Sequence, residues 1–574
     1  MVFLDPITLS VIRGRLLSIA NGMLEVAFRC GVTSYMYEIR DCSFGLIDRQ
    51  GGLIAQSDGI PLFAGSLGPA VKNCMEIVGT ENLEEGDVVI SNLPSITGNH
   101  TCDGILFVPI FYKGRLFGFA SGKSHWIDLG AKGSYPADAR DIFEEGLRIP
   151  PLKIYKRGRL NEEVWGIVKA NSRAPDLVFG DMQAQIAACR FAQAQLTELL
   201  DRYGEELVEA SIEEIYDHSE RTLREAIRRL PDGVWEAEDF LDDVREPLRL
   251  KVMKAGDRLV VDLSGSAPEQ VGTLNSLWVT TVSAVRFAVK ALFCPDLPPN
   301  EGFSRPIEVV APYGSIFNAS PSVPCFLCGN VAQTIIELMN KALHTVLPER
   351  IPACSGADVI GNGFFGVRRD GKYWGTIVPS IIGQGADHLS DGENYLMHPS
   401  CGGGKNLPVE ILESKYPLFV ERLEFVQDSG GAGRQRGGLG SLIEVRLLSA
   451  ATFFCFIEKS KTPHFGLFGG KPGLRNYAVV NSKRMGVFEV LKTSGIELEE
   501  GDSVVIVAGG GGGYGNPLER DPQRVLWDVI NGYVSLDAAR REYGVVIDPR
   551  DMAIDWDLTS REREKRTKRG KDDL

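Results

Sequence analysis

The sequence predicts a multidomain protein of the mixed α/β (α+β) class. Its 574 residues exceed what one ordinary core accommodates, so we expect about two to four domains. Hairpin patterns dominate the N-terminal part, long helical periodicity the next part, and glycine-rich loops between short strands the C-terminal half. We therefore predict four regions: a β-hairpin-rich α+β region with the metal-site hairpins at 1–160, a helical region at 161–231, a mixed α/β region with glycine-rich loops at 232–518, and C-terminal helices with a charged tail at 519–574.

The composition argues against a protein that binds nucleic acid or membranes. Apolar residues make up 44% and charged residues 24% of the chain, and the net charge of −14 is opposite to what phosphate contacts require. No apolar run reaches the roughly 18 residues of a membrane span, and the segment 1–6 lacks the charged start of a secretory signal. The eleven cysteines are an odd number and are scattered. We therefore expect a cytoplasmic protein with no membrane or nucleic-acid partner.

The first elements are an amphipathic helix and a β-hairpin. Asp5 can cap a helix that begins at Pro6 and continues to residue 29 with an apolar stripe. Strands at 42–47 and 53–56 flank the turn DRQGG and predict a hairpin. Asp41 stands immediately before the first strand, where a carboxylate on its own is typical of a solvated or capping residue.

A second hairpin is predicted at 105–120, with a Lys-Gly turn. Pairing of Tyr112 with Arg115 and a regular register would place Asp103 opposite Ser124. The residues that precede and follow this hairpin would then meet at its open end.

Two His-x-x-Asp pairs flank this second hairpin: His100 with Asp103, and His125 with Asp128. The predicted register gathers His100, Asp103 and His125. Two imidazoles and a carboxylate with room left for water describe a catalytic zinc or manganese site better than a closed structural one. The alternative is that these are ordinary surface histidines at strand ends.

Periodicity predicts the remaining elements. Long helices at 181–203 and 205–230 are expected to pack as an antiparallel group. The basic run 561–571 alternates with acids and indicates a solvated or frayed tail. Further helices are predicted at 279–293, 325–347, 521–531 and 535–543, and strands within 235–263 and 305–316 and at 439–448, 452–458, 477–480 and 503–508.

Motifs of other catalytic classes are missing. The chain contains no GxxxxGK[ST] phosphate loop and no GxSxG nucleophile elbow. The dense glycines, including Gly509–Gly513, therefore indicate tight turns and close backbone approach rather than a nucleotide site.

The sequence gives weaker evidence for a functional role of several other cysteines and histidines. Cys325 and Cys328 have redox spacing but no second pair, so we interpret them as part of a buried helix start. Cys102 should face away from the neighbouring aspartate in an extended segment, towards the core. His388 and His398 are candidates for a substrate pocket, although solvated loop positions are the commoner explanation for such residues.

A series of motifs runs in order through nearly the whole chain: DPITLSVIRGRL, EIRDCSFGLIDRQGGLIAQ, GNHTCDGILFVPIFYKGRLFGFASGKSHWIDLGA, EEGLRIPPLKIY, FGDMQAQIAACR, NEGFSRPIEVVAPYGSIFNA, LPVEILESKYPLFVERLEFVQDSGGAGRQRGGLG and GGGGGYGNPLERDP. By these motifs the chain resembles the hydantoinase B/oxoprolinase family. That family supplies the metal-bearing subunit of ATP-dependent cyclic-amide hydrolases, such as hydantoinase and caprolactamase, and of related ketone carboxylases.

The resemblance implies a set of site residues. A divalent metal ion would be held by an aspartate of the first hairpin and by the His-x-x-Asp and the histidine of the second, here Asp41, His100, Asp103 and His125. Asp128 would then orient a ligand imidazole. Asp41 and Asp128 are accordingly the candidate catalytic residues.

The sequence departs from the family pattern at three places. Leu93 replaces the aspartate of a usual Asn-Asp-Pro, Phe63 stands where a histidine is common, and Trp126 stands where a second histidine often follows the first. These changes leave the four expected ligands intact but alter their surroundings, and so bear on the substrate.

The implied function is ATP-dependent opening of a hydantoin, lactam or oxoproline-like ring by a hetero-oligomer. A hydantoinase A-like partner would bind ATP and phosphorylate the amide carbonyl, which agrees with the missing nucleotide motif. A divalent ion lowers the pKa of water, and Asp41 is a candidate to take the proton. Two alternatives remain open: a subunit of a ketone carboxylase of the acetone or acetophenone type, and a non-catalytic, metal-stabilised scaffold subunit.

Overall fold

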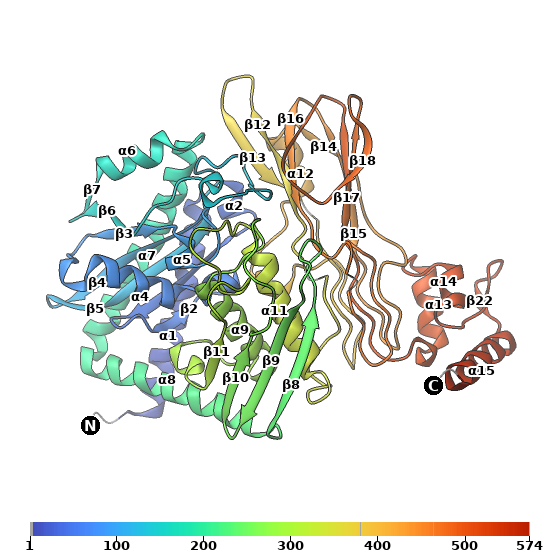
Figure 1. The fold of residues 1–574 in the computed structure, drawn as a ribbon. Coiled ribbons are helices and arrows are strands. Elements are labelled where there is room, and N and C mark those ends of the chain that lie inside the picture. Colours follow the sequence, from blue (N-terminus) through green and yellow to red (C-terminus); the bar gives the residue numbers. More distant parts are fainter. Residues whose placement is uncertain (1–3, 357, 379, 463, 573–574) are drawn as a thin grey trace.

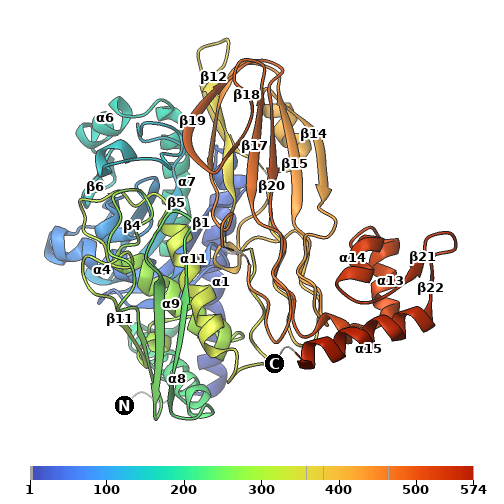
Figure 2. The ribbon, with the colours of Figure 1, turned by 45° about the vertical axis from the view of Figure 1, so that its right-hand side comes forward.

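A computed structural model describes residues 4–572 except 357, 379 and 463, with side chains described up to 567. The N-terminal α/β part lies beside a central part of helices and a small sheet, and a tall β-rich part follows (Figure 1). A small helical arm projects from the β-rich part at the C-terminus, as Figure 2 shows from a second side. The predicted mixed α/β multidomain class is confirmed, and the four region boundaries stay predictions.

A seven-stranded sheet forms the N-terminal part, in the order β2-β1-β5-β4-β3-β6-β7. Helices α1 and α7 cover one face, and α4 covers the other. Burial on both faces explains why β4 and β5 are apolar almost throughout. The strands are β1 (Cys42–Asp48), β2 (Leu53–Gln56), β3 (Val88–Ser91), β4 (Asp103–Tyr112), β5 (Arg115–His125), β6 (Leu152–Lys156) and β7 (Arg159–Leu160).

Helix α1 begins where the sequence predicts, whereas α7 begins six residues before the predicted start at 181. Asp5 accepts a hydrogen bond from the Thr8 backbone N–H at 2.9 Å, so it caps α1. The expected antiparallel helical group is wrong, because α7 packs mainly along α1 and α8 packs mainly against α10. The helices are α1 (Pro6–Cys30), α2 (Ser34–Tyr37), α3 (Pro61–Ala64), α4 (Leu67–Val78), α5 (Pro94–Thr97), α6 (Glu162–Ala170), α7 (Pro175–Tyr203) and α8 (Glu205–Arg228), with short 3-10 turns at Thr80–Asn82 and Ile142–Glu145.

The central part pairs a four-stranded sheet, β11-β10-β9-β8, with two long helices, α9 and α11. Cys328 begins α11 and is buried with Cys325, as the helix-start interpretation predicted. The elements are β8 (Gly233–Asp239), β9 (Leu248–Ala255), β10 (Arg258–Asp262), α9 (Trp278–Phe293), α10 (Glu301–Ser304), β11 (Ile307–Val310) and α11 (Cys328–Leu343).

Two further sheets, β13-β12-β16-β19 and β14-β15-β20-β17-β18, build the β-rich part. The strands at β15, β16, β17 and β20 were predicted; the other five were not. Bounds are β12 (Gly361–Val367), β13 (Tyr373–Ile377), α12 (Val409–Lys415), β14 (Leu418–Phe425), β15 (Ser441–Leu447), β16 (Ala451–Phe456), β17 (Tyr477–Ser482), β18 (Gly486–Val490), β19 (Lys492–Leu498) and β20 (Ser503–Val507), with 3-10 turns at Pro399–Cys401 and Pro517–Glu519.

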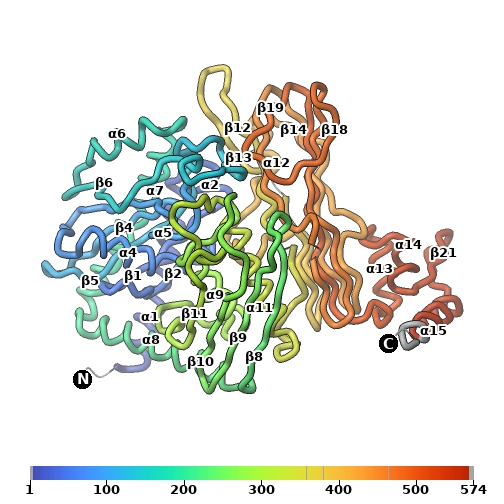
Figure 3. The backbone as a smooth tube through the Cα atoms, viewed as in Figure 1, coloured from blue at the N-terminus to red at the C-terminus, as the bar shows by residue number. Residues whose placement is uncertain are grey.

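Glycine-rich extended segments at 382–386, 429–440, 464–473 and 509–514 lie side by side below these sheets, and we call them the glycine bundle. Figure 3 shows them as closely spaced, nearly parallel traces. The segments hydrogen-bond through their backbones, as from the Gly431 N–H to the Gly511 oxygen at 2.8 Å. A β-carbon on Gly511 would lie only 2.0 Å from the Gln384 oxygen. The predicted close backbone approach is therefore confirmed.

The C-terminal arm consists of α13 (Pro522–Ile530), α14 (Leu536–Arg541), β21 (Ile547–Asp548), β22 (Ala553–Ile554) and α15 (Trp556–Asp572). The run 561–571 was predicted to be a solvated or frayed tail; the frayed alternative is wrong, since the run belongs to α15, and its side chains at 561–567 are exposed or partly exposed. Thr559, at the start of this helix, is buried and accepts a hydrogen bond from the Val546 N–H, which ties the helix to the arm. None of the helices in the described ranges combines the length and apolarity needed to cross a membrane.

Candidate metal centre

Asp103 and His125 face each other at the open end of the β4–β5 hairpin. Asp103 begins β4, His125 ends β5, and the two are direct cross-strand partners. Strand alternation places both on the sheet side of Phe107 and Phe119, the side covered by α4. His100 approaches from the preceding turn, and the potential ligand atoms of the three residues lie within 4.8 Å of one another.

The predicted register was wrong by one residue. A β-bulge shifts the pairing between Ile110 and Phe111, so that His125 rather than Ser124 lies opposite Asp103. An extra residue on one strand bends the hairpin and breaks the simple count from the turn. The shift brings His125 closer to the carboxylate than a regular hairpin would.

Both imidazoles turn one nitrogen towards the carboxylate. Nε2 of His100 lies 3.4 Å from Oδ2 of Asp103, and Nδ1 of His125 lies 3.2 Å from Oδ1. The other ring nitrogens are buried and have no hydrogen-bond partner among the described residues. Burial lowers the pKa of His100 to about 4, so its ring is neutral, which is the metal-ligating form. A buried carboxylate with two such imidazoles fits a divalent metal ion.

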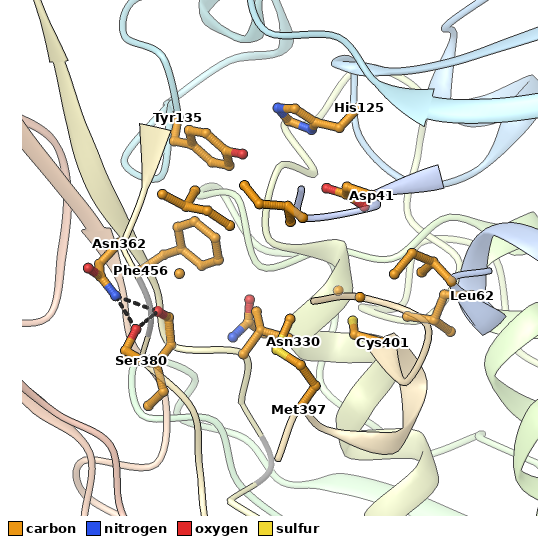
Figure 4. Close-up of a pocket in the computed structure, with 18 of the residues that line it drawn as sticks. Asp41, Leu62, His125, Tyr135, Asn330, Asn362, Ser380, Met397, Cys401 and Phe456 are labelled. Carbon is orange, nitrogen blue, oxygen red and sulfur yellow. Dashed lines mark hydrogen bonds between the residues drawn. The ribbon is translucent and has the colours of Figure 1, made fainter. Parts of the chain in front are cut away.

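Asp41 lies beside this cluster but outside the group of three. Its backbone oxygen accepts the His125 N–H at 3.1 Å, and the residue lines the same cavity as the cluster. Figure 4 shows its carboxylate on the cavity wall below His125. Burial raises the pKa of Asp41 to about 6, against the opposing effect of His125. Its role as a ligand or proton acceptor stays a prediction.

Asp128 is held by an arginine rather than by an imidazole. Arg173 Nε donates to Oδ1 of this buried carboxylate at 2.9 Å, and Ser172 Oγ donates to Oδ2 at 3.4 Å. Within the described residues, no hydrogen bond joins Asp128 to His100 or His125. Its contacts therefore anchor the segment before α7 and do not support the orienting role expected for it.

Lys123 is a site residue that the sequence reasoning missed. It precedes His125 by two positions and so shares its strand face. Its fully buried ammonium donates to the backbone oxygens of Thr97 and Gly98 and to Oδ1 of Asn99, at 2.7, 3.0 and 2.8 Å. These bonds hold the turn from which His100 extends. The sequence signal that could have identified Lys123 was its position two residues before His125, a candidate metal ligand.

A cavity of about 160 Å³ opens on the cluster (Figure 4). The N-terminal sheet supplies one side of it, and residues after 325 supply the other. The start of α11 was not predicted to take part, and in the segment 397–407 only His398 was a predicted pocket candidate. The sequence signal for the role of α11 was the recurrence of polar residues at helical spacing, which indicates a polar helix face. The apolar lining includes Ile60, Leu62, Phe326, Ile360, Val378 and Phe456.

The two loop histidines take different positions. His398 is fully buried, so the solvated interpretation is wrong for it; its neighbour Met397 lines the cavity. Its ring contacts Glu337 and Ser400 behind the cavity wall. His388 does not line the cavity; its backbone oxygen accepts a hydrogen bond from Arg434.

The departures from the family pattern have unequal consequences. Phe63 lines the cavity, so it alters the space offered to a ligand. Trp126 faces α7, where Nε1 donates to Gln185 at 2.8 Å, and its ring lies over Gly104. Cys102 is buried, as predicted, and is not part of the three-residue cluster.

The fold and the cluster define a multidomain chain with a candidate metal site at an internal cavity. The hydantoinase B/oxoprolinase family model matches residues 5–517, and the chain belongs to this family. One subunit of the putative D-/L-hydantoinase of Pseudomonas sp. (strain NS671) is 32% identical over 97% of this chain and 98% of its own length. The beta subunit of the caprolactamase of Pseudomonas jessenii is 34% identical over 95% of this chain and 96% of its own length.

A solved structure supports the same assignment. The crystal structure of the ATP-dependent caprolactamase from Pseudomonas jessenii matches with a TM-score of 0.92 at 32% identity, covering 98% of this chain and 100% of that chain. Both sequence relatives are named as single subunits of an enzyme, which implies a partner subunit. The comparisons place the chain in a family that processes cyclic amides.

Proposed function

We propose that this chain is the metal-bearing subunit of an ATP-dependent cyclic-amide hydrolase that acts with a hydantoinase A-like ATP-binding subunit. The observation that carries the proposal is the cluster of His100, Asp103 and His125 on the wall of a largely apolar cavity. Relatives named hydantoinase and caprolactamase support hydrolysis of cyclic amides. The absence of a nucleotide-binding motif in the sequence agrees with ATP bound by the partner.

The three residues of the cluster would hold a divalent metal ion, zinc or manganese, with Asp41 as a further, loosely bound ligand. Such an ion supplies Lewis-acid chemistry and lowers the pKa of water. The Asp41 carboxylate lies at the cavity next to the cluster, where it can accept the proton of an attacking water. The apolar wall limits access of bulk water, which strengthens the interactions of these charges.

Elemental analysis of the purified chain tests the site. We expect near-stoichiometric metal in the wild type and its loss in His100→Ala and Asp103→Ala, each checked for retained fold by circular dichroism. The exposed residues His218 and Asp296 give matched controls, His218→Ala and Asp296→Ala, which should keep the metal.

Metal-loaded wild type, combined with the partner subunit and ATP, should then open a hydantoin or lactam ring, and the two cluster variants should not. A wild type that holds no metal after chelator-free purification and reloading would overturn the catalytic-site assignment. That result would favour the scaffold alternative.

A further inference from the structure

Helix α11 presents a buried polar face to the cavity. Asn330, Gln333, Thr334 and Glu337 recur at helical spacing, and each side chain is at most 2% exposed. Asn330 and Gln333 line the cavity, and residues three apart on a helix share a side. Because buried amides need partners for both their nitrogen and their oxygen, the partners inside the protein determine what is left for a ligand.

A buried carboxylate orients the amide of Asn330. Nδ2 donates to Oδ1 of Asp358 at 2.8 Å, and the other oxygen of Asp358 accepts the Glu458 N–H at 2.6 Å. Burial raises the pKa of Asp358 to about 7, and above this pH its carboxylate only accepts hydrogen bonds. In that state a nitrogen of Asn330 faces Asp358, and the carbonyl oxygen of Asn330 takes the opposite direction. Figure 4 shows this oxygen on the cavity side. No hydrogen bond to it is made within the described part of the chain.

A chain of hydrogen bonds orients Gln333 in the same sense. Oε1 of Glu337 lies 3.3 Å from Nε2 of His398, so this nitrogen carries the proton and Nδ1 accepts from Ser400 Oγ at 2.7 Å. The Ser400 oxygen then accepts from Nε2 of Gln333 at 3.3 Å. Oε1 of Gln333 is buried and has no partner among the described residues.

We propose that the carbonyl oxygens of Asn330 and Gln333 accept hydrogen bonds from the N–H groups of the ligand, so that the cavity selects cyclic amides or ureides with a free ring N–H over ketones. The inference rests on the proposed function, because it names the substrate class of the same cavity. A ketone or a lactone leaves both acceptors unpaired in an apolar surrounding, a lactam pairs one of them with its single N–H, and a ureide can pair both. An unpaired buried acceptor is strongly unfavourable.

Calorimetric titration of the full-length chain with three six-membered rings tests this selection. δ-Valerolactam carries an N–H, δ-valerolactone replaces it with an oxygen of similar size, and cyclohexanone has only the carbonyl. We expect the lactam to bind at least about tenfold more tightly than either other ring. Equal affinities, or no binding of the lactam at millimolar concentration, would overturn the inference.

Two nearly isosteric substitutions assign the preference to α11. Because the lactam has one N–H, at least one of Asn330→Leu and Gln333→Leu should reduce the lactam-to-lactone ratio to about threefold or less. Asn531→Leu, an exposed substitution in the C-terminal arm, should keep the full ratio. A ratio that stays at wild-type level in both folded α11 variants would contradict the assignment.

The experiments distinguish failure of the inferred lactam preference from failure of the proposed function. A chain that keeps its metal and opens rings but binds lactam and lactone equally overturns the inference and leaves the function standing. A chain that prefers the lactam yet holds no metal supports the inference and overturns the metal-dependent function.

Discussion

The seven-stranded sheet and the glycine bundle are stabilised in opposite ways. In the sheet, side chains fill the layers, as where the rings of Phe107 and Phe119 meet edge to face at 5.5 Å. In the glycine bundle, backbones replace side chains, and a β-carbon on Gly511 or Gly437 would lie 2.0 or 1.9 Å from a carbonyl oxygen. The crowding resembles the axis of the collagen triple helix, where only glycine fits.

This difference determines which part of the molecule can carry side chains that bind or react with a ligand. The sheet accepts polar residues at its open end, where Asp103, Lys123 and His125 share one face. The bundle leaves no room for side chains, but its first segment continues directly from Ser380 and Ile381 of the cavity wall into Gly383. The bundle therefore acts as a rigid support for the wall opposite the cluster, while the sheet supplies the candidate ligands.

The largest effect is expected from Gly511→Ala. The added methyl group would meet the Gln384 backbone at 2.0 Å, where no flexible side chain can yield, so the free energy of unfolding should fall by about 3 kcal/mol or more. Gly166→Ala in α6 is the matched control, because nothing lies within 4 Å of its β-carbon and alanine favours helices.

Denaturant melts of both glycine variants provide the measurement. A Gly511→Ala protein as stable as wild type would show that the bundle tolerates side chains, and the contrast with the sheet would not hold.

An intermediate effect is expected from Lys123→Met within the sheet. Removal of the ammonium leaves the Thr97 oxygen and Oδ1 of Asn99 without this donor, whereas the Gly98 oxygen keeps the Thr97 hydroxyl at 3.3 Å. The free energy of unfolding should fall by about 1–3 kcal/mol. Because these bonds hold the turn of His100, metal affinity should also fall by about 10–100-fold. Lys169→Met, at an exposed position of α6, should change neither quantity.

Metal titration and thermal melts of Lys123→Met separate its two effects. Wild-type metal affinity in a destabilised variant would mean that Lys123 supports the fold without positioning His100.

Local patterns predicted much of the sheet half. The Asp5-Pro6 start of α1, the hairpin of β1 and β2 and the approach of His100 to Asp103 follow from capping, turn and strand signals of neighbouring residues. The partner of Asp103 could not be predicted, because a bulge depends on packing of the whole hairpin.

The other half of the site depends on residues far apart in the sequence. Glu337, His398 and Ser400 orient Gln333 only because the fold brings α11 and the loop before α12 together. The glycines predicted close approach of backbones but not which segments approach. Residue 511 meets 384 and 431, and no periodicity connects those positions.

The smallest effect is expected at the junction between the glycine bundle and the C-terminal arm. Arg520 donates to both oxygens of Asp391 at 2.6 and 2.7 Å. Burial acts to raise the pKa of Asp391, but the hydrogen bonds and charge of Arg520, together with those of Arg436, lower this pKa below its usual range. A carboxylate with a lowered pKa stabilises the fold above its ordinary pKa, and this contribution is lost as the pH falls through the lowered value.

Below about pH 4 the arm should therefore lose protection before the sheet does. Amide hydrogen exchange should show earlier exposure of α13 than of β4 and β5, and Asp391→Asn should already expose α13 at neutral pH with little further change on acidification. Equal acid sensitivity of α13 in wild type and Asp391→Asn would show that this ion pair does not fasten the arm, and that other contacts, such as the hydrogen bond from the Ser535 N–H to Asp428 at 2.8 Å, hold it next to the glycine bundle.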